Sequence, residues 1–212
     1  MAHSGFFDRR RTLHLAALLP AGLLAACQLP GQGAPPRIFR LTPKTTFDEL
    51  PRVDWALVVD RPSVDRAVDT TRIARRSAVE IEYFADATWV DRPGNMIEPL
   101  LIQSFRSSNA IDVVAARRAN IRPDFMLQTD LTAFYAEPGT EAPPAARVVI
   151  AATLLSMPQR DVVGTSEFAS TVAATDGDLP AIVNAIDEAL GKVFKRLVEW
   201  TIATGEAAHA AS

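Results

Sequence analysis

The last quarter of the chain carries the pattern that most restricts the fold. From Asp178 to about Ala203, apolar residues recur at intervals of three and four, as expected for one face of a helix. Asp178 is a suitable N-cap, and Pro180 is tolerated in the first turn. The predicted helix has about 24 residues and a length of about 36 Å. The apolar stripe consists of Ile182, Ile186, Leu190, Val193, Leu197 and Trp200. A stripe of this length needs a long apolar surface to cover it, and a sheet provides one.

The strand signals lie before this helix. Apolar runs and alternating patterns bounded by turn residues predict strands over 38–42, 53–60, 71–76, 78–84, 111–116, 125–136, 148–155 and 161–173. Residues 71–76 and 78–84 are predicted to form a strand or hairpin pair. The last three strands follow one another through short turns, which favours antiparallel pairing. A second amphipathic helix is predicted from Asn95, as its cap, to about Ser108. We therefore predict an α+β fold: a two-layer domain with a mainly antiparallel or mixed sheet of about six strands and two amphipathic helices packed on it.

The segment 125–136 gives the clearest strand pattern. Strict alternation places Phe125, Leu127, Leu131 and Tyr135 on one face, and Gln128, Asp130 and Thr132 on the other.

The N-terminus has the organisation of a bacterial export signal. Arg9–Arg11 is followed by an apolar run of about 12 residues, too short to span a bilayer comfortably. The run ends in Leu24-Ala25-Ala26-Cys27, the lipobox pattern, in which the cysteine thiol receives a diacylglyceryl group and the chain is cut before it. An ordinary buried cysteine in a helix is the weaker alternative. General secretion is favoured over twin-arginine export.

These signals divide the chain into four parts. We expect a signal peptide over residues 1–26, a lipidated tether over 27–37, one folded domain over 38–204 and a flexible tail over 205–212. The tether is rich in Pro and Gly, so it is expected to be extended. Cys27 is the predicted lipid-attachment site, carrying a fatty acid such as palmitate.

The composition excludes several classes of function. His3 and His14 lie in the predicted signal and His209 in the tail, so the folded domain has neither a free thiol nor an imidazole. Catalysis by Ser-His-Asp or Cys-His groups and a Cys/His zinc site are therefore not expected. No catalytic, cofactor-binding or metal-binding residues are predicted, and the protein is not expected to be an enzyme. The net charge of −3 gives no electrostatic case for nucleic acid.

Several segments, in this order and spacing behind a lipobox, resemble one known family. They are Asp69–Arg75, Glu80–Trp89, Phe125–Glu137, Gln159–Val163 with Phe168, and Ala185–Thr201. The chain is similar to the ABC-type transport auxiliary lipoproteins, a family that includes the paraquat-inducible protein C type. The likeness extends from about Ile38 to Ala203.

The resemblance implies a periplasmic accessory subunit. Such proteins accompany an ABC ATPase, a permease and an MCE-domain protein, which together move phospholipid or other hydrophobic molecules between the inner and outer membranes. Attachment to the outer membrane is expected, and Gln28 after the cysteine agrees with this. The inner membrane is the alternative. Some members form rings, so a homo-oligomer is a further expectation.

Other interpretations remain open. The chain could instead be a lipoprotein scaffold of another envelope machine, such as outer-membrane assembly or cell-wall attachment. A tethered hydrolase that works through carboxylates is the poorest candidate. Trp89 and Trp200 are expected to pack in the core rather than to contact a lipid or partner. The clusters Arg117, Arg118, Arg122 and Arg72, Arg75, Arg76 are either anion sites or solvated faces, and the second is favoured.

Overall fold

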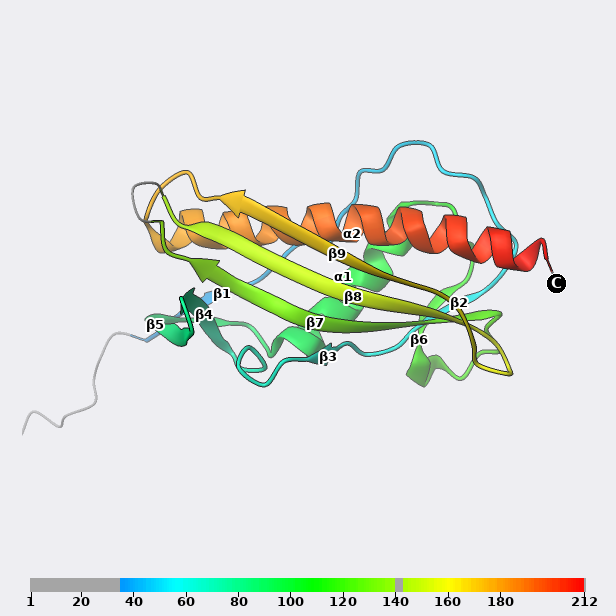
Figure 1. The fold of residues 1–212 in the computed structure, drawn as a ribbon, viewed down its shortest axis with the longest axis horizontal. Coiled ribbons are helices and arrows are strands. Elements are labelled where there is room, and N and C mark those ends of the chain that lie inside the picture. Colours follow the sequence, from blue (N-terminus) through cyan, green and yellow to red (C-terminus); the bar gives the residue numbers. More distant parts are fainter. Residues whose placement is uncertain (1–34, 140–142, 212) are drawn as a thin grey trace, which may run out of the picture. The chain divides into compact units, whose positions relative to one another are not determined.

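Three long strands form the centre of the sheet. The computed structural model describes residues 35–139 and 143–211. Strands β7 (Phe125–Glu137), β8 (Ala145–Ser156) and β9 (Asp161–Ala173) pair antiparallel along nearly their full length. In Figure 1 they run side by side along the longest helix. The meander predicted from the sequence is thereby confirmed.

Short strands complete the sheet on the other edge of β7. β2 (Leu57–Val59), β3 (Ser63–Val64) and β4 (Arg72–Ser77) each pair with β7 in parallel. β6 (Val114–Ala116) extends the sheet beyond β2, while β5 (Glu80–Trp89) and then β1 (Arg37–Phe39) extend it beyond β4. The sheet is mixed and has nine strands among the described residues, several of only two or three residues.

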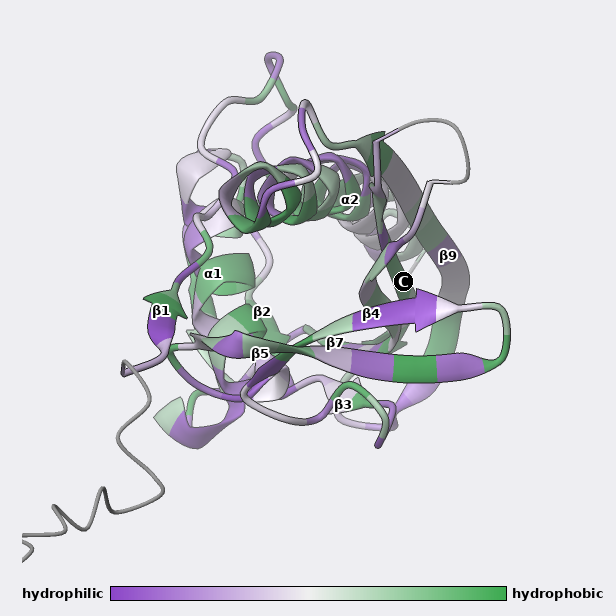
Figure 2. Ribbon diagram, turned by 90° about the vertical axis from the view of Figure 1, so that its left-hand side faces the viewer, coloured by the Kyte–Doolittle hydropathy of each residue, from purple (hydrophilic) through white to green (hydrophobic). Residues whose placement is uncertain are grey.

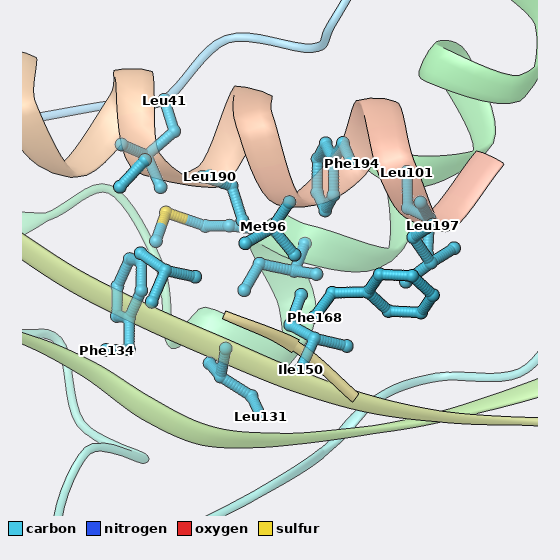
Figure 3. Packing of buried hydrophobic residues seen from close by; sticks show 14 of the residues in the cluster. Leu41, Met96, Leu101, Leu131, Phe134, Ile150, Phe168, Leu190, Phe194 and Leu197 are labelled. Carbon is cyan, nitrogen blue, oxygen red and sulfur yellow. The ribbon is translucent and has the colours of Figure 1, made fainter. Parts of the chain in front are cut away.

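Two helices cover one core. α1 (Pro93–Ser107) and α2 (Leu179–His209) contribute to the same cluster of buried residues as the sheet, so the α+β prediction is confirmed. Figure 2 shows both helices lying on the same side of β7. The predicted stripe of α2 is buried, from Ile182 to Leu197, and Figure 3 shows Leu190, Phe194 and Leu197 directed towards Leu131 and Ile150 of the sheet.

Both helix boundaries differ from the prediction. α1 begins at Pro93 with Arg92 as its N-cap, and Asn95 does not cap it. The side-chain amide of Asn95 instead donates to Asp91, at 3.0 Å. α2 continues past Ala203 to His209, so the expected tail begins with helical residues. Gly205 is buried on this extension, which gives the last turns a packing contact that the stripe did not reveal.

A bulge in β7 overturns the predicted orientation of Tyr135. Leu131 lies opposite Ile150 of β8, but Ala133 lies opposite Val149, so Thr132 has no partner of its own. The alternation shifts by one residue beyond this point. Phe134, opposite Val148, therefore faces the helices, and Tyr135 faces the other way.

The strands predicted over 53–60 and 111–116 are shorter than expected. Only Leu57–Val59 and Val114–Ala116 are regular strand, while Val53 and Ile111 form an isolated bridge. The preceding residues form an extended segment, 40–52, which we call the strap. Thr42 binds Asp187 of α2 through its backbone N–H (2.7 Å) and its hydroxyl (2.6 Å). Lys195 of α2 lies 2.6 Å from Asp48 and fixes the strap at a second point.

Candidate functional site

The predicted lipid-attachment residue, Cys27, lies outside the described residues, and its modification stays a prediction. The described chain begins at Pro35, just before β1. Within residues 35–139 and 143–211, β1 pairs only with β5 and forms one edge of the sheet. Figure 2 shows this edge beside α1. Any tether preceding the domain therefore joins it at this edge.

The two tryptophans considered in the sequence analysis belong to the core or its margin. Trp89 is only 2% exposed, and its ring centroid lies 5.3 Å from that of Phe134. Trp200 is partly buried, with its ring 5.7 Å from that of Phe168 in an edge-on arrangement. Core packing was the favoured interpretation of both residues, and the structure confirms it.

Arginines 117, 118 and 122 do not form one anion site. Arg117 lies 2.9 Å from Asp60, and Arg118 lies 2.7 Å from Glu98, whose side chain is almost completely buried in α1. The two guanidinium groups are thus committed to different carboxylates. Their role is to neutralise and position these acidic groups at the edge of the fold.

The second arginine cluster has a more distinctive environment. Antiparallel pairing of β4 and β5 forms a hairpin over residues 72–89, which we call the arginine hairpin. The guanidinium of Arg72 lies 3.7 Å from the ring centroid of Tyr83, within the range of a cation–π contact. Arg75 lies 2.6 Å from Glu82 and 5.8 Å from the centre of the Phe84 ring. Because Tyr83 and Phe84 are adjacent in β5, these two arginine–aromatic contacts lie on opposite faces of the hairpin.

Arg76 connects this hairpin to the long strands. It donates to the hydroxyl of Tyr135 at 2.7 Å and to the carbonyl of Ala78 at 3.0 Å. The hydrogen bond with Tyr135 raises the pKa of Arg76 above its ordinary value. The turn beyond Arg76 carries Val79, whose side chain is 97% exposed. The hairpin is thus held to β7 along its side and presents an apolar residue at its tip.

The sequence predicted a strand or hairpin pair over 71–76 and 78–84, and the antiparallel pairing of β4 with β5 confirms it. Asp69–Arg75 and Glu80–Trp89 both contribute to the family resemblance, and here they lie mostly in adjacent strands. Sequence reasoning identified the arginines but not their aromatic partners.

A groove beside β1 was missed altogether. It has a volume of about 440 Å³ and an apolar lining formed by Leu41, Val90, Met96, Pro99 and Leu100, with Arg40, Asp91 and Asn95 at its rim. Hydrogen bonds from the Asn95 side chain and the Arg92 backbone lower the pKa of Asp91 below its ordinary value. The groove forms where β1 meets the end of β5 and the start of α1. These last two elements follow β1 by about 50 residues in the chain.

Two further features of the described residues bear on the kind of site present. Residues 35–139 and 143–211 contain no group of three or more His, Cys, Asp or Glu side chains placed to hold a metal ion. No helix in the same part of the chain has the length and apolar character needed to cross a membrane.

The fold is shared with solved structures. Protein XCC0632 from Xanthomonas campestris, a DUF330 protein, is 30% identical over 82% of this chain and 98% of its own, with a TM-score of 0.77. A second, uncharacterized protein shares the fold with a TM-score of 0.63 at 12% identity, over 78% of this chain and 98% of its own. The PelC dodecamer from Paraburkholderia phytofirmans, at 15% identity over 72% of this chain and 95% of its own, has a TM-score of only 0.44, too low to bear on assembly here. No curated protein sequence matches the chain.

The sequence match identifies the class. The model of the ABC-type transport auxiliary lipoprotein component family matches residues 40–198, which is most of the described domain. The chain belongs to this family, as the resemblance predicted. It is therefore a lipoprotein component of an ABC-type transport system, located in the cell envelope.

Proposed function

We propose that the protein is a non-catalytic periplasmic subunit of an ABC transport system that contains an MCE-domain protein. In this role it is anchored by lipid on Cys27, in the outer membrane, and helps to move phospholipid or other hydrophobic molecules between the two membranes. The family match over residues 40–198 is the observation that carries the proposal. No cofactor is part of this function.

The arginine hairpin is the surface we assign to the MCE-domain partner. Its two strands contain segments on which the family resemblance depends, and its tip exposes Val79 almost completely. The guanidinium groups of Arg72 and Arg75 lie over or beside aromatic rings. Such stacking reduces the rotamer freedom of arginine before a partner binds, and this lowers the entropic cost of association.

A site-specific photocrosslinker tests this assignment in intact cells. Placed at Val79, it should form an adduct with the MCE-domain protein, identified by mass spectrometry after purification of the membranes. Val113, which is 46% exposed and adjoins β6, provides a matched control position from which no such adduct is expected. Adducts with a barrel-assembly or cell-wall protein, and none with an MCE-domain protein, would instead support the alternative envelope scaffold.

A further inference from the structure

We infer that the edge of the domain around β1 docks on the anionic bilayer surface to which the chain is tethered. We call this edge the β1 face and define it by Ile38 and Val90 together with Arg37, Arg40, Arg61 and Arg92. The inference rests on the proposed lipid anchor at Cys27. It goes beyond that anchor because it gives the folded domain a fixed orientation on the membrane.

The apolar part of the β1 face is exposed to solvent. Ile38 is 70% exposed and Val90 is 61% exposed, both unusually high for large apolar side chains. Ile38 lies opposite Thr88 in the parallel pairing of β1 with β5, and Val90 follows Thr88 by two residues. Val90 lies just beyond β5, and its backbone N–H donates to the carbonyl of Phe39 at 2.8 Å, so Val90 and Ile38 lie close together at this edge of the sheet. Val90 also lines the apolar groove, so its surroundings continue the apolar surface inward.

The rim of this surface is cationic. Arg37, Arg40 and Arg61 are exposed and form no ion pair with other described residues. Arg61 lies over the start of α1, where its Nε would be 3.5 Å from a Cβ added to Gly94. Arg92, with a side chain 60% exposed, lies 3.7 Å from Asp69.

Acidic groups also lie at this rim. Asp91 accepts hydrogen bonds from the backbone of Arg92 at 2.7 Å and from the Asn95 side chain at 3.0 Å. One of its oxygen atoms is therefore already engaged, and the Asp69 carboxylate is directed to Arg92. Asp86 is also exposed and adjoins Ala87, which lies opposite Arg37 in the pairing of β1 with β5. Four arginines against three carboxylates leave the β1 face with one positive charge in excess.

The start of the described chain identifies the bilayer as the occupant. Pro35 follows Cys27 by only eight positions, and a chain of this length spans at most about 30 Å when fully extended. A lipid on Cys27 therefore keeps β1 close to the headgroups. Apolar tips surrounded by arginines are the combination that binds an anionic membrane interface, where the apolar groups enter and the cations pair with phosphate.

A pair of matched valines provides the test. The chain has a single cysteine, so acylated Cys27 leaves an introduced thiol as the only free one. Two variants of the mature, lipidated protein, Val90→Cys and Val162→Cys, each carry a fluorophore on the introduced thiol. Each variant is reconstituted into vesicles of phosphatidylethanolamine and phosphatidylglycerol. Val162 is 63% exposed and lies near the start of β9, at the end of the sheet away from β1 in Figure 1.

The inference predicts opposite quenching at the two positions. Brominated lipid should quench the label at position 90 several-fold more than the label at position 162, and aqueous iodide should do the reverse. The double variant Arg40→Gln, Arg61→Gln should lower the equilibrium constant for docking on these vesicles about fivefold for each arginine removed. It should not change docking on vesicles of pure phosphatidylcholine. Arg122→Gln is the control, since Arg122 is exposed and outside the β1 face.

The outcomes separate this inference from the function on which it rests. Protein that floats with the vesicles while both labels remain accessible to iodide would overturn the docking inference and leave the transport role intact. Protection of position 90 only when the partner complex is added would also overturn it, because the face would then be a protein contact. Protein that fails to float would refute the lipid anchor, and the inference with it.

Discussion

Gly205 of α2 packs directly against the ring of Trp55. A Cβ added to Gly205 would lie 2.7 Å from Cζ2 of the indole, closer than real Cβ contacts allow. Trp55 is itself 2% exposed and meets Phe125 edge-on, with ring centroids 5.0 Å apart. This contact joins the last turns of α2 to the residues before β2 and to the start of β7, and it accounts for the continuation of the helix beyond Ala203.

Gly205→Ala should destabilise the domain. The added methyl group must displace a buried indole ring, and overpacking of this kind costs about 1–3 kcal/mol. The higher helix propensity of alanine returns at most about 1 kcal/mol of this. Urea unfolding should show a lower midpoint with an unchanged slope.

Gly191→Ala is the control for this change and should have the opposite sign. Gly191 lies in the same helix, but an added Cβ would meet nothing within 4 Å. Alanine should therefore stabilise the domain by about 0.5–1 kcal/mol through helix propensity alone. If both substitutions raised the midpoint, the close contact between Gly205 and Trp55 would be contradicted.

The bulge in β7 makes a second prediction, about two adjacent aromatic residues. Phe134→Ala should cost about 3–5 kcal/mol, because Phe134 is 2% exposed and packs against Trp89. Tyr135→Phe should cost only about 1 kcal/mol, since it removes one hydrogen bond to Arg76 and leaves the ring in place. Denaturant unfolding of the two variants ranks them directly. A larger loss of stability for Tyr135→Phe than for Phe134→Ala would contradict the bulge and support the unbroken alternation predicted from the sequence.

The bulge also shows where sequence reasoning stops. Periodicity over ten or more residues correctly located β7, β9 and the buried face of α2, and a continuous apolar run located β8. The single unpaired residue Thr132 produces no repeated pattern, and it reverses the orientation of the later side chains of β7 relative to the predicted alternation. The end of α2 was missed for a similar reason. The residue that extends the packed face, Gly205, has no side chain to register as apolar.

The candidate surfaces were harder still to foresee. Both tryptophans and both arginine clusters could be identified as residues, but their roles depend on partners distant in sequence. Tyr135 meets Arg76 across 59 positions. The groove beside β1 requires three separate elements to meet. No local pattern encodes such contacts, and the family resemblance predicted the class of protein without indicating them.

The attachment of the strap to α2 supplies a third prediction. Asp187→Ala removes the acceptor of both hydrogen bonds from Thr42 and should cost about 1 kcal/mol, since this contact is exposed to solvent. Hydrogen exchange should accelerate at the backbone amide of Thr42. Glu188→Ala is the adjacent control. It removes only an exposed pair with Lys192 four residues along the helix, worth about 0.3–0.5 kcal/mol, and should leave exchange in the strap unchanged.

The second attachment of the strap should depend on pH. The hydrogen bond and charge of Lys195 lower the pKa of Asp48 below its ordinary 3.8, and Asp48 raises the pKa of Lys195 above 10.5. A lowered carboxyl pKa stabilises the fold above pH 3.8 and loses this effect as the pH falls through the folded-state value. The raised lysine pKa stabilises it below pH 10.5, with loss as the pH rises through the folded-state value.

The difference in unfolding free energy between the natural chain and Asp48→Asn therefore measures this contact. It should be constant between pH 3.8 and 10.5 and should shrink on both sides. High salt should reduce it throughout, because the pair is exposed. A difference that grew as the pH fell below 3.8 would contradict the assigned pairing.

Cys27→Ala should separate anchoring from folding. The substituted residue precedes the described domain, whose core is formed entirely by residues from Leu41 onwards. The variant should therefore unfold with the same urea midpoint as the lipidated protein released from its membrane by detergent. It should not incorporate radiolabelled palmitate, and it should appear in the soluble fraction of the cell envelope. The acyl chains bind the membrane with about 0.8 kcal/mol per buried methylene, and the variant lacks these chains. Persistent membrane association without label would show that another contact holds the protein at the membrane.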